Sequence, residues 1–350
     1  MSERGAGMAT DIAEQPAVYG ALLEPASVGQ IEQVARAIAE RRPKHVVFTA
    51  RGTSDHAALY AAYLTEIRLG LPAGLASPSA ITVYGARPDF SEALVVGVSQ
   101  SGGSPDLTEV LKIAREQGAL TLAVTNNPKS ILNETAELTV DVAAGHERAV
   151  AATKTYTAEL LALLLLVEAI RGGGSVPADE LAALAKLPEL AEQTARDDTP
   201  AQLAERYRFA GRVVTTGRGY AYPTAREAAL KLMETSYLAA LAFSGADLLH
   251  GPLAMADPDV PVLAVVGSGP GGAAMKDVLD RLGERRADVV TIGSGEVTTA
   301  SARLAVPEVD ERYSALLDIL PLQKLALAIA LSRGENPDAP RGLKKVTETL

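Results

Sequence analysis

The 350-residue chain has 47% apolar and 22% charged residues, and it contains no cysteine. This length predicts about two globular domains, each large enough to bury a core. The missing cysteine excludes disulfides, thiolate metal sites and a cysteine nucleophile. A net charge of -10, with the acidic residues spread along the chain, argues against nucleic acid as a partner.

Neither end of the chain nor its most apolar stretch predicts a membrane partner. Residues 1–10 contain no apolar signal-peptide core, so we expect a cytoplasmic protein. Residues 160–167 form the most apolar run, but Glu159 and Glu168 close it. The run is far shorter than the roughly 20 residues that a membrane span needs. It is therefore predicted to be a buried helix.

The first half of the chain follows an α/β plan. Residues 45–50 (HVVFTA), 51–56 (RGTSDH) and 57–67 (AALYAAYLTEI) read as a buried strand, a loop and a helix. The same order returns in EALVVGV, SQSGGSPD and LTEVLKIAREQ at 92–117, and two more strands are predicted at 120–127 and 138–143. Residues 44–145 are thus predicted to form one doubly wound parallel sheet.

Residues 212–305 repeat this plan. Arg218-Gly219 follows the strand RVVTTG as Arg51-Gly52 follows HVVFTA, and VPVLAVVGSGPGG at 260–272 matches EALVVGVSQSGG at nearly the same offset. Two matches at one spacing indicate a tandem duplication. We expect a helical leader at 1–30, a first domain with connector helices at 31–198, a second domain at 199–335 and a tail at 336–350.

A loop of small polar residues follows the second strand of the first repeat. Residues 99–104, the serine loop (SQSGGS), stand where ligands bind in open α/β sheets, beyond the carboxyl end of a strand and before a helix. Backbone N–H groups, close approach at Gly102 and Gly103, and hydroxyl donors suit a phosphate monoester without any lysine. The plainer alternative is a turn in which Ser104 caps the helix and Pro105 opens it.

The corresponding loop of the second repeat is rich in glycine. Gly267, Gly269 and Gly272 satisfy a dinucleotide-binding pattern. No acidic residue ends the following strand DVVTI, and the loop follows the second strand of its repeat, not the first. We therefore do not expect a nicotinamide cofactor and interpret residues 267–272, the glycine loop, as a degenerate twin of the serine loop. With the histidines (His45, His56, His146 and His250) far apart in sequence, no metal site is predicted.

Seven motifs in order resemble the sugar isomerase (SIS) domain family, in particular the isomerase half of glucosamine-6-phosphate synthase. They are DIAEQP at 11, RGTSDHAA at 51, SQSGGSPD at 99, ERAVAATKTYT at 147, GRGYAYPTAREAALKLMETSY at 217, HGPLA at 250 and PRGLKKVTET at 340. The resemblance implies two αβα SIS domains with five-stranded parallel sheets, an ordered C-terminal tail, and a homodimer whose subunits share active sites. It also implies that no cofactor is needed.

The resemblance further implies the role of each site residue. Glu234 would move a proton between carbons 1 and 2 of a hexose, with Lys231 beside it, while His250 would open the sugar ring and Lys345 would act from the tail. Val150 and Ala152 would line the sugar pocket. The phosphate would be held by residues of two loops: Thr53, Ser54, Ser99, Gln100, Ser101 and Ser104.

Taken without the resemblance, each catalytic candidate has a structural interpretation. Glu234 could be a solvated helix residue, and Lys231 could pair with it or with Glu227 across a helical turn. His250 could be a loop residue and Lys345 a surface lysine, and the tail could be frayed.

Departures from the synthase pattern narrow the predicted reaction. The chain has no glutaminase segment and no cysteine, Ala152 stands in VAAT where the synthase has VAST, and Asp247 replaces a glutamate. We therefore expect an isomerising deaminase of glucosamine 6-phosphate that does not depend on glutamine. The alternatives are a lyase acting on N-acetylglucosamine 6-phosphate, a deglycase of amino-acid adducts of sugar phosphates, and a sugar-phosphate sensor without catalysis.

Overall fold

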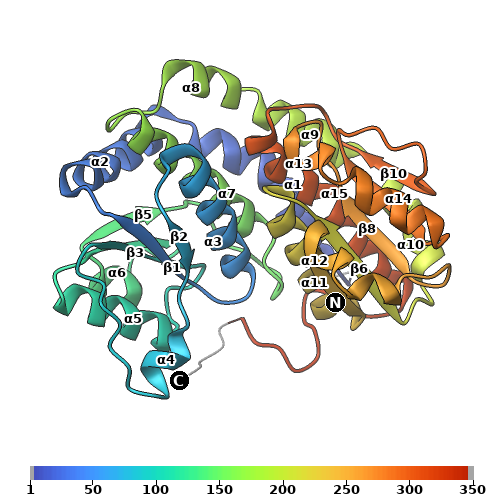
Figure 1. Ribbon diagram of the computed structural model, residues 1–350, viewed down its shortest axis with the longest axis horizontal. Coiled ribbons are helices and arrows are strands. Elements are labelled where there is room, and N and C mark those ends of the chain that lie inside the picture. Colours follow the sequence, from blue (N-terminus) through green and yellow to red (C-terminus); the bar gives the residue numbers. More distant parts are fainter. Residues whose placement is uncertain (1–3, 346–350) are drawn as a thin grey trace. The chain divides into compact units, whose positions relative to one another are not determined.

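The computed structural model describes residues 4–345 (Figure 1). The first three residues of the predicted leader and the last five of the predicted tail lie outside the described residues. Contacts group the chain into two compact units. The first unit comprises residues 15–147 and 154–188 and the tail from Lys344; the second comprises the residues up to Glu14, residues 148–153 and residues 189–343.

The first unit is built on a parallel sheet of order β2-β1-β3-β4-β5. Every residue of β3 and β4 is buried, as expected for central strands covered on both faces. Helices α4, α5 and α6 lie on one face, and α2, α3 and α7 cover the other (Figure 1). The strands are β1 His45–Thr49, β2 Ala73–Leu75, β3 Ala93–Ser99, β4 Leu120–Thr125 and β5 Leu138–Asp141.

The helices of the first unit alternate with these strands. They are α2 Pro25–Arg41, α3 Thr53–Leu64 with a π-helical extension at Thr65–Leu69, α4 Pro78–Thr82, α5 Pro105–Glu116, α6 Ile131–Thr135, α7 Lys154–Arg171 and α8 Ala178–Leu184. Helix α1 Ala6–Leu22 contributes residues to both units.

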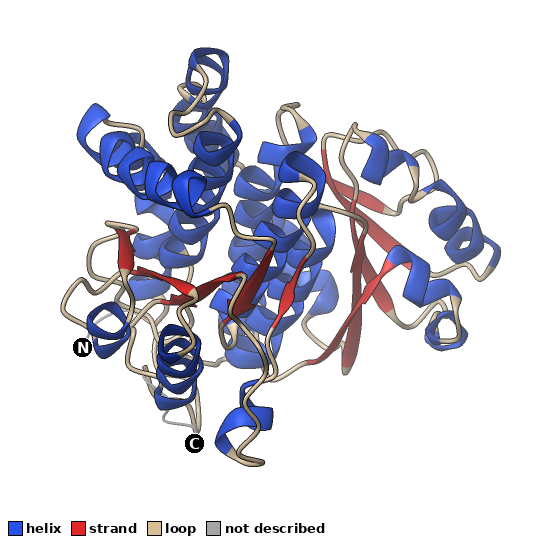
Figure 2. Ribbon diagram, turned by 60° about the vertical axis from the view of Figure 1, so that its left-hand side comes forward, coloured by secondary structure: helices blue, strands red, loops and turns tan. Residues whose placement is uncertain are grey.

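The second unit contains the second sheet, of order β10-β9-β8-β6-β7 (Figure 2). Its strands are β6 Arg212–Gly217, β7 Ala239–Ser244, β8 Pro261–Val265, β9 Asp288–Gly293 and β10 Ala302–Ala305. Its helices are α9 Leu187–Arg196, α10 Thr199–Tyr207, α11 Ala221–Ser236, α12 Gly245–Leu249, α13 Pro270–Ala273, α14 Lys276–Glu284 and α15 Glu311–Ser332, with a short 3-10 turn at Pro252–Met255.

The two sheets confirm the predicted duplication. Read from the other edge, the second sheet has the order of the first, and β8 pairs with β6 and β9 as β3 pairs with β1 and β4. The matching glycines Gly52 and Gly219 also share a positive φ, of 56° and 58°. The predicted strands are all present, whereas the positions of β2, β7 and β10 were not identified from the sequence.

Two long apolar helices occupy the cores. The predicted buried helix at 160–167 is the centre of α7, and every residue of that run is buried. Helix α15 is the one described helix long and apolar enough to span a membrane, but most of its apolar residues are buried inside the fold. A core helix passes the same test of length and composition, so α15 is weak evidence for a membrane span.

Candidate functional site

The serine loop connects β3 to α5 at the carboxyl edge of the first sheet. Gly102 adopts φ of 60°, which favours glycine. A Cβ at this position would also collide with the Ser130 side chain. The loop therefore needs a glycine at position 102, both for its backbone conformation and for its close approach to Ser130.

Hydroxyl groups within the serine loop accept hydrogen bonds from its own main chain. The N–H of Gly102 donates to Ser99 Oγ (3.1 Å), and the N–H of Gly103 donates to Ser101 Oγ (3.2 Å). Ser104 occupies the N-cap position of α5 with Pro105 at its first turn, but the Ser104 side chain makes no capping hydrogen bond. Capping by the Ser104 hydroxyl therefore does not account for the serines of this loop.

Residues after β4 support the serine loop from outside, and the sequence analysis did not identify them. Asn127 Nδ2 donates to the carbonyl of Ser101 (3.2 Å), and the N–H of Asn126 donates to the carbonyl of Gln100 (3.2 Å). The signal was the NNP turn directly after a buried strand that neighbours β3. These bonds hold the carbonyls of Gln100 and Ser101, while the N–H groups of Gly102 and Gly103 donate to hydroxyls of the loop itself.

The loop after β1 adjoins the serine loop, because β1 and β3 are neighbouring parallel strands. Arg51 Nε donates to Asp106 Oδ2 at 2.8 Å and so joins the RGTSDH motif to the first turn of α5. Thr53 begins α3 directly after Gly52. Ser54 is buried and donates to Glu159 Oε1 at 2.8 Å. The predicted phosphate-binding residues thus come from two adjacent loops of one unit.

Glu234 belongs to a buried ionic cluster on α11 in the second unit. Lys231 Nζ lies 2.5 Å from Glu234 Oε2 and 3.3 Å from Glu227 Oε1, so the lysine pairs with both carboxylates that the sequence offered as alternatives. The side chains of Lys231 and Glu227 are fully buried, whereas 22% of the Glu234 side chain is exposed. Glu234 is therefore the member of the cluster that solvent or a ligand can reach.

The charge of Lys231 is fixed by this cluster. Burial disfavours the ammonium, but the carboxylates of Glu227 and Glu234 outweigh burial, and the pKa of Lys231 is raised. A lysine held in the charged form does not act as a proton acceptor at neutral pH. Its role is to orient the Glu234 carboxylate and to offset part of the negative charge.

His250 stands at the C-terminal end of α12 and is exposed. Its Nδ1 lies 2.8 Å from the carbonyl oxygen of Ala246. Since a carbonyl only accepts hydrogen bonds, Nδ1 carries the proton in this contact and Nε2 points elsewhere. The helix itself is capped by Ser244, whose hydroxyl oxygen accepts the N–H of Asp247.

Residues 148–153 belong to the second unit, although they lie between strands and helices of the first repeat in the sequence. Asp11 Oδ2 accepts the N–H groups of Arg148 (2.7 Å) and Ala149 (3.0 Å), and its Oδ1 accepts Arg148 Nη1 (2.9 Å). Val150 and Ala152 thus follow a segment that the DIAEQP motif holds in place.

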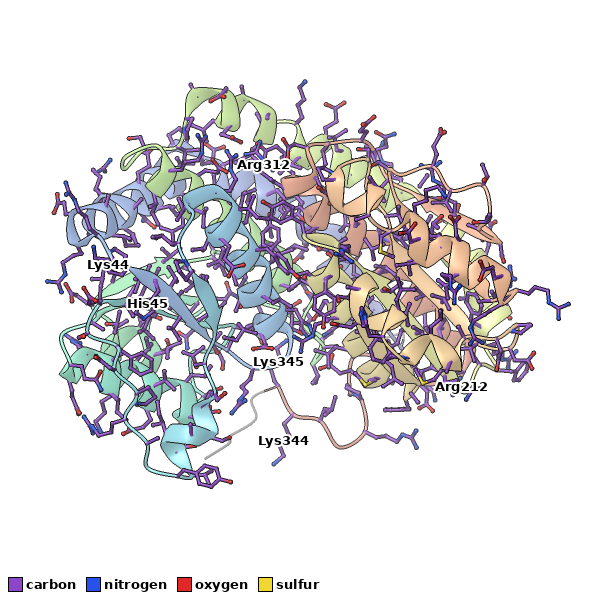
Figure 3. All side chains as sticks on the ribbon, in the orientation of Figure 1. Lys44, His45, Arg212, Arg312, Lys344 and Lys345 are labelled. Carbon is purple, nitrogen blue, oxygen red and sulfur yellow. The ribbon has the colours of Figure 1, made fainter. Side chains whose placement is uncertain are left out.

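The C-terminal tail is held by specific contacts. Asp338 accepts the N–H groups of Gly7 and Met8, and the N–H of Arg341 donates to the Tyr237 hydroxyl at 2.7 Å. Lys344 and Lys345 then group with the first unit, the one that contains the serine loop; Figure 3 shows both side chains on the tail. The described part of the tail, up to Lys345, is therefore not frayed.

The predicted site residues fall into two sets. Thr53, Ser54, the serine loop and Lys345 belong to the first unit, and Lys231, Glu234, His250, Val150 and Ala152 belong to the second. Within residues 4–345, no hydrogen bond joins His250 to Glu234, and no group of three acidic or histidine side chains could hold a metal ion.

A match to a protein-family model identifies the family of this chain. The SIS domain model matches residues 41–169 and 207–346, one match for each repeat. The chain belongs to the SIS domain family. As in the predicted architecture, each SIS repeat contains one five-stranded parallel sheet.

Relatives of this SIS chain include enzymes of sugar-phosphate metabolism. A glutamine–fructose-6-phosphate aminotransferase (isomerizing) of Thermococcus kodakarensis is 36% identical over 89% of the chain and 54% of its own length. The chain spans about half the length of the curated relatives it matches. A solved structure of a Silicibacter pomeroyi protein assigned as a phosphosugar isomerase is 34% identical, with a TM-score of 0.87 over 95% of this chain and 99% of that chain.

A second solved structure is the C-terminal domain of glucosamine-fructose-6-phosphate aminotransferase from Francisella tularensis. It is 27% identical and covers 95% of this chain and 98% of that chain, with a TM-score of 0.86. The similarity thus extends through both SIS repeats.

Proposed function

We propose that this SIS protein is a hexosamine-phosphate enzyme, an isomerising deaminase that converts glucosamine 6-phosphate and water into fructose 6-phosphate and ammonia. The observation that carries the proposal is the cluster on α11, in which a buried lysine holds a partly exposed carboxylate, Glu234. The relatives at 34–36% identity, an isomerizing aminotransferase and a protein assigned as a phosphosugar isomerase, support the same class of substrate.

The proposed reaction moves one proton and then releases the amine. Once the ring is open, Glu234 removes the proton from carbon 2 and returns it to carbon 1. A second proton passes from the amine nitrogen to the oxygen on carbon 1, so that the aldehyde becomes an alcohol and carbon 2 becomes an imine. Water adds to the imine carbon, and ammonia leaves as the ketone forms. A carboxylate positioned over the carbon-bound proton is the group that this transfer needs.

The remaining roles follow from the chemistry of each side chain. His250, with Nδ1 engaged by a carbonyl, can exchange a proton at Nε2 with the ring oxygen or the hydroxyl on carbon 1. The serine loop offers N–H and hydroxyl donors to the phosphate, together with Thr53. We assign Lys345 to the sugar end of the substrate, Val150 and Ala152 to the wall of the sugar pocket, and the whole protein to a cytoplasmic homodimer.

Ammonia release from glucosamine 6-phosphate tests the proposal directly. The wild type is expected to release ammonia without glutamine, and Glu234→Gln is expected to lower kcat by roughly 10²- to 10⁴-fold, the usual contribution of a general base. Glu205→Gln, an exposed carboxylate on α10, is the matched control and should retain full activity.

Other substrates separate the alternatives in the same assay. Loss of water from N-acetylglucosamine 6-phosphate would identify a lyase, and release of an amino acid from its sugar-phosphate adduct would identify a deglycase. Tight binding of hexosamine phosphates with no product from any of them would identify a sensor. Each of these results, without ammonia from glucosamine 6-phosphate, contradicts the deaminase.

A further inference from the structure

The glycine loop of the second repeat occupies the position that the serine loop occupies in the first. It follows β8, which takes the place of β3 in the sheet, and it leads into α13 and α14. A cavity of about 780 Å³ opens on this loop. That volume lies within the range of small-molecule sites, so the size of the cavity does not explain why the second repeat would bind no sugar phosphate.

The N–H groups of the glycine loop already have an anionic partner. The N–H of Gly272 donates to Glu311 Oε1 at 3.1 Å, and Gly271 also lies against this carboxylate. Glu311 lies in the first turn of α15, directly after the N-cap Asp310. Burial raises the pKa of Glu311, while the hydrogen bonds from the loop oppose this effect.

Because glycine has no side chain, the loop leaves room for the Glu311 carboxylate. A Cβ added at Gly269 would lie 2.6 Å from Glu311 Oε2, and one added at Gly271 would lie 2.5 Å from Glu311 Oε1. The glycines therefore let a carboxylate approach the main chain as closely as a phosphate would. In the serine loop, by contrast, no acidic side chain within residues 4–345 accepts a hydrogen bond from residues 99–104.

The residues that line the cavity beside the glycine loop add to the difference between the two loops. Its walls include Glu296, Glu308 and Asp280, while Lys276, the cation among the lining residues, pairs with Asp280 at 2.5 Å. The surroundings of the glycine loop are thus negatively charged even apart from Glu311.

We propose that Glu311 is an internal substitute for a ligand anion: its carboxylate occupies the N–H groups of the glycine loop and confines anion binding to the serine loop. This makes Glu311 a specificity-determining residue that acts by exclusion. The inference rests on the proposed function only in naming the serine loop as the site that remains.

Rescue of a variant by phosphate tests the proposal. Glu311→Ala removes the carboxylate, while Asp310 still caps α15 because its side chain accepts the N–H of Arg312. We expect a lower Tm for this variant, and a rise of a few degrees when sodium phosphate replaces sodium chloride at equal ionic strength. Glu308→Ala, which removes a carboxylate from the same cavity, is the control, because within residues 4–345 Glu308 forms no hydrogen bond with residues 267–272.

The difference between the two variants decides the outcome, because any phosphate bound at the serine loop stabilises both equally. A larger phosphate response in Glu311→Ala than in Glu308→Ala supports the proposal, and equal responses overturn it. Glu311→Gln should respond like the control, since its amide oxygen still accepts the N–H groups; a response equal to that of Glu311→Ala also overturns it. If Glu311→Ala does not fold, Glu311→Ser takes its place.

Crystal structures of Glu311→Ala and of the wild type soaked in phosphate distinguish a failure of this inference from a failure of the proposed function. Phosphate at residues 267–272 in the variant, and not in the wild type, supports the role of Glu311. Absence of phosphate from the serine loop in both proteins contradicts the proposed function alone. Phosphate at the serine loop of the variant with none at the glycine loop contradicts the role of Glu311 alone.

Discussion

Two buried ionisable side chains, Lys231 and Asp318, differ in whether the fold places an opposite charge beside them. Lys231 has two carboxylates within 3.3 Å, and its charge is retained because both partners favour the ammonium. Asp318, on α15, is buried to 1% exposure, and no cation is hydrogen-bonded to it within residues 4–345. The Lys231 ammonium holds the Glu234 carboxylate by a hydrogen bond. The Asp318 carboxyl, in contrast, reduces the stability of the folded protein when it ionises.

Asp318 gives a prediction of stability against pH. Burial raises its pKa to about 7; the nearby Ser314 hydroxyl opposes this effect, and the charge of Glu311 adds to it. Because the pKa in the folded state lies above that in the unfolded state, ionisation lowers stability progressively from about pH 4 to pH 7. The loss is complete above pH 7, and three pKa units correspond to at most about 4 kcal/mol.

The measurement is a denaturant titration of Asp318→Asn at pH 4 and pH 8. The asparagine does not ionise, so the variant should be more stable than the wild type at pH 8, and the difference should nearly vanish at pH 4. Asp259→Asn, an exposed aspartate of the same unit, should show no such trend. A stability difference that does not change with pH would contradict the proposed ionisation of Asp318.

The partners of single residues could be predicted from the sequence only in part. The spacing of Glu227, Lys231 and Glu234 allows the lysine either partner, and the structure gives it both because the three side chains share one face of α11. The relation of Glu311 to the glycine loop joins residues 39 positions apart. No local pattern predicts such a contact, since it depends on where α15 packs.

Whole elements were predictable where burial was continuous. The strands β1, β3 and β4 are runs of apolar residues, and each was predicted from its sequence. β2 has three residues, β7 has one buried residue, and β10 alternates weakly between buried and exposed residues. Edge strands of this kind carry little hydrophobic signal, because one side of each has no neighbouring strand to cover it.

The segment 148–153 is positioned by another element, α1, through a single buried carboxylate. Asp11→Ala would leave the N–H groups of Arg148 and Ala149 without their acceptor, at a cost of about 1–3 kcal/mol for buried donors. Since Val150 and Ala152 are assigned to the sugar pocket, we expect KM for glucosamine 6-phosphate to rise several-fold, with a smaller change in kcat.

A neighbouring carboxylate provides the control for Asp11. Glu14 also pairs with Arg148, at 2.8 Å, but its side chain is 36% exposed. Steady-state kinetics of Glu14→Ala should match those of the wild type, because exposed ion pairs contribute little. Equal effects of the two variants would show that the charge of Arg148, not the main chain, sets the pocket.

The whole molecule is a duplication whose two halves have diverged in chemistry more than in backbone. The family model matches both repeats, and the sheets share one strand order, but one repeat presents serines and the other glycines with a carboxylate between them. The repeat was visible in the sequence because backbone requirements preserve glycines at fixed places. The contact of Glu311 with the glycine loop was not visible in the sequence, which showed only that this loop has fewer hydroxyl groups than the serine loop.

Gly52 and Gly219 allow backbone and function to be separated across the two repeats. Both have positive φ, and an added Cβ at either position would meet nothing within 4 Å, so an alanine is penalised by its backbone alone. Gly52→Ala and Gly219→Ala should therefore both lower stability, by about 1–3 kcal/mol. Only Gly52 precedes Thr53 beside the serine loop, so only Gly52→Ala should raise KM for the sugar phosphate. Thermal melts and steady-state kinetics of both variants check this, and an equal rise in KM would contradict a functional difference between the repeats.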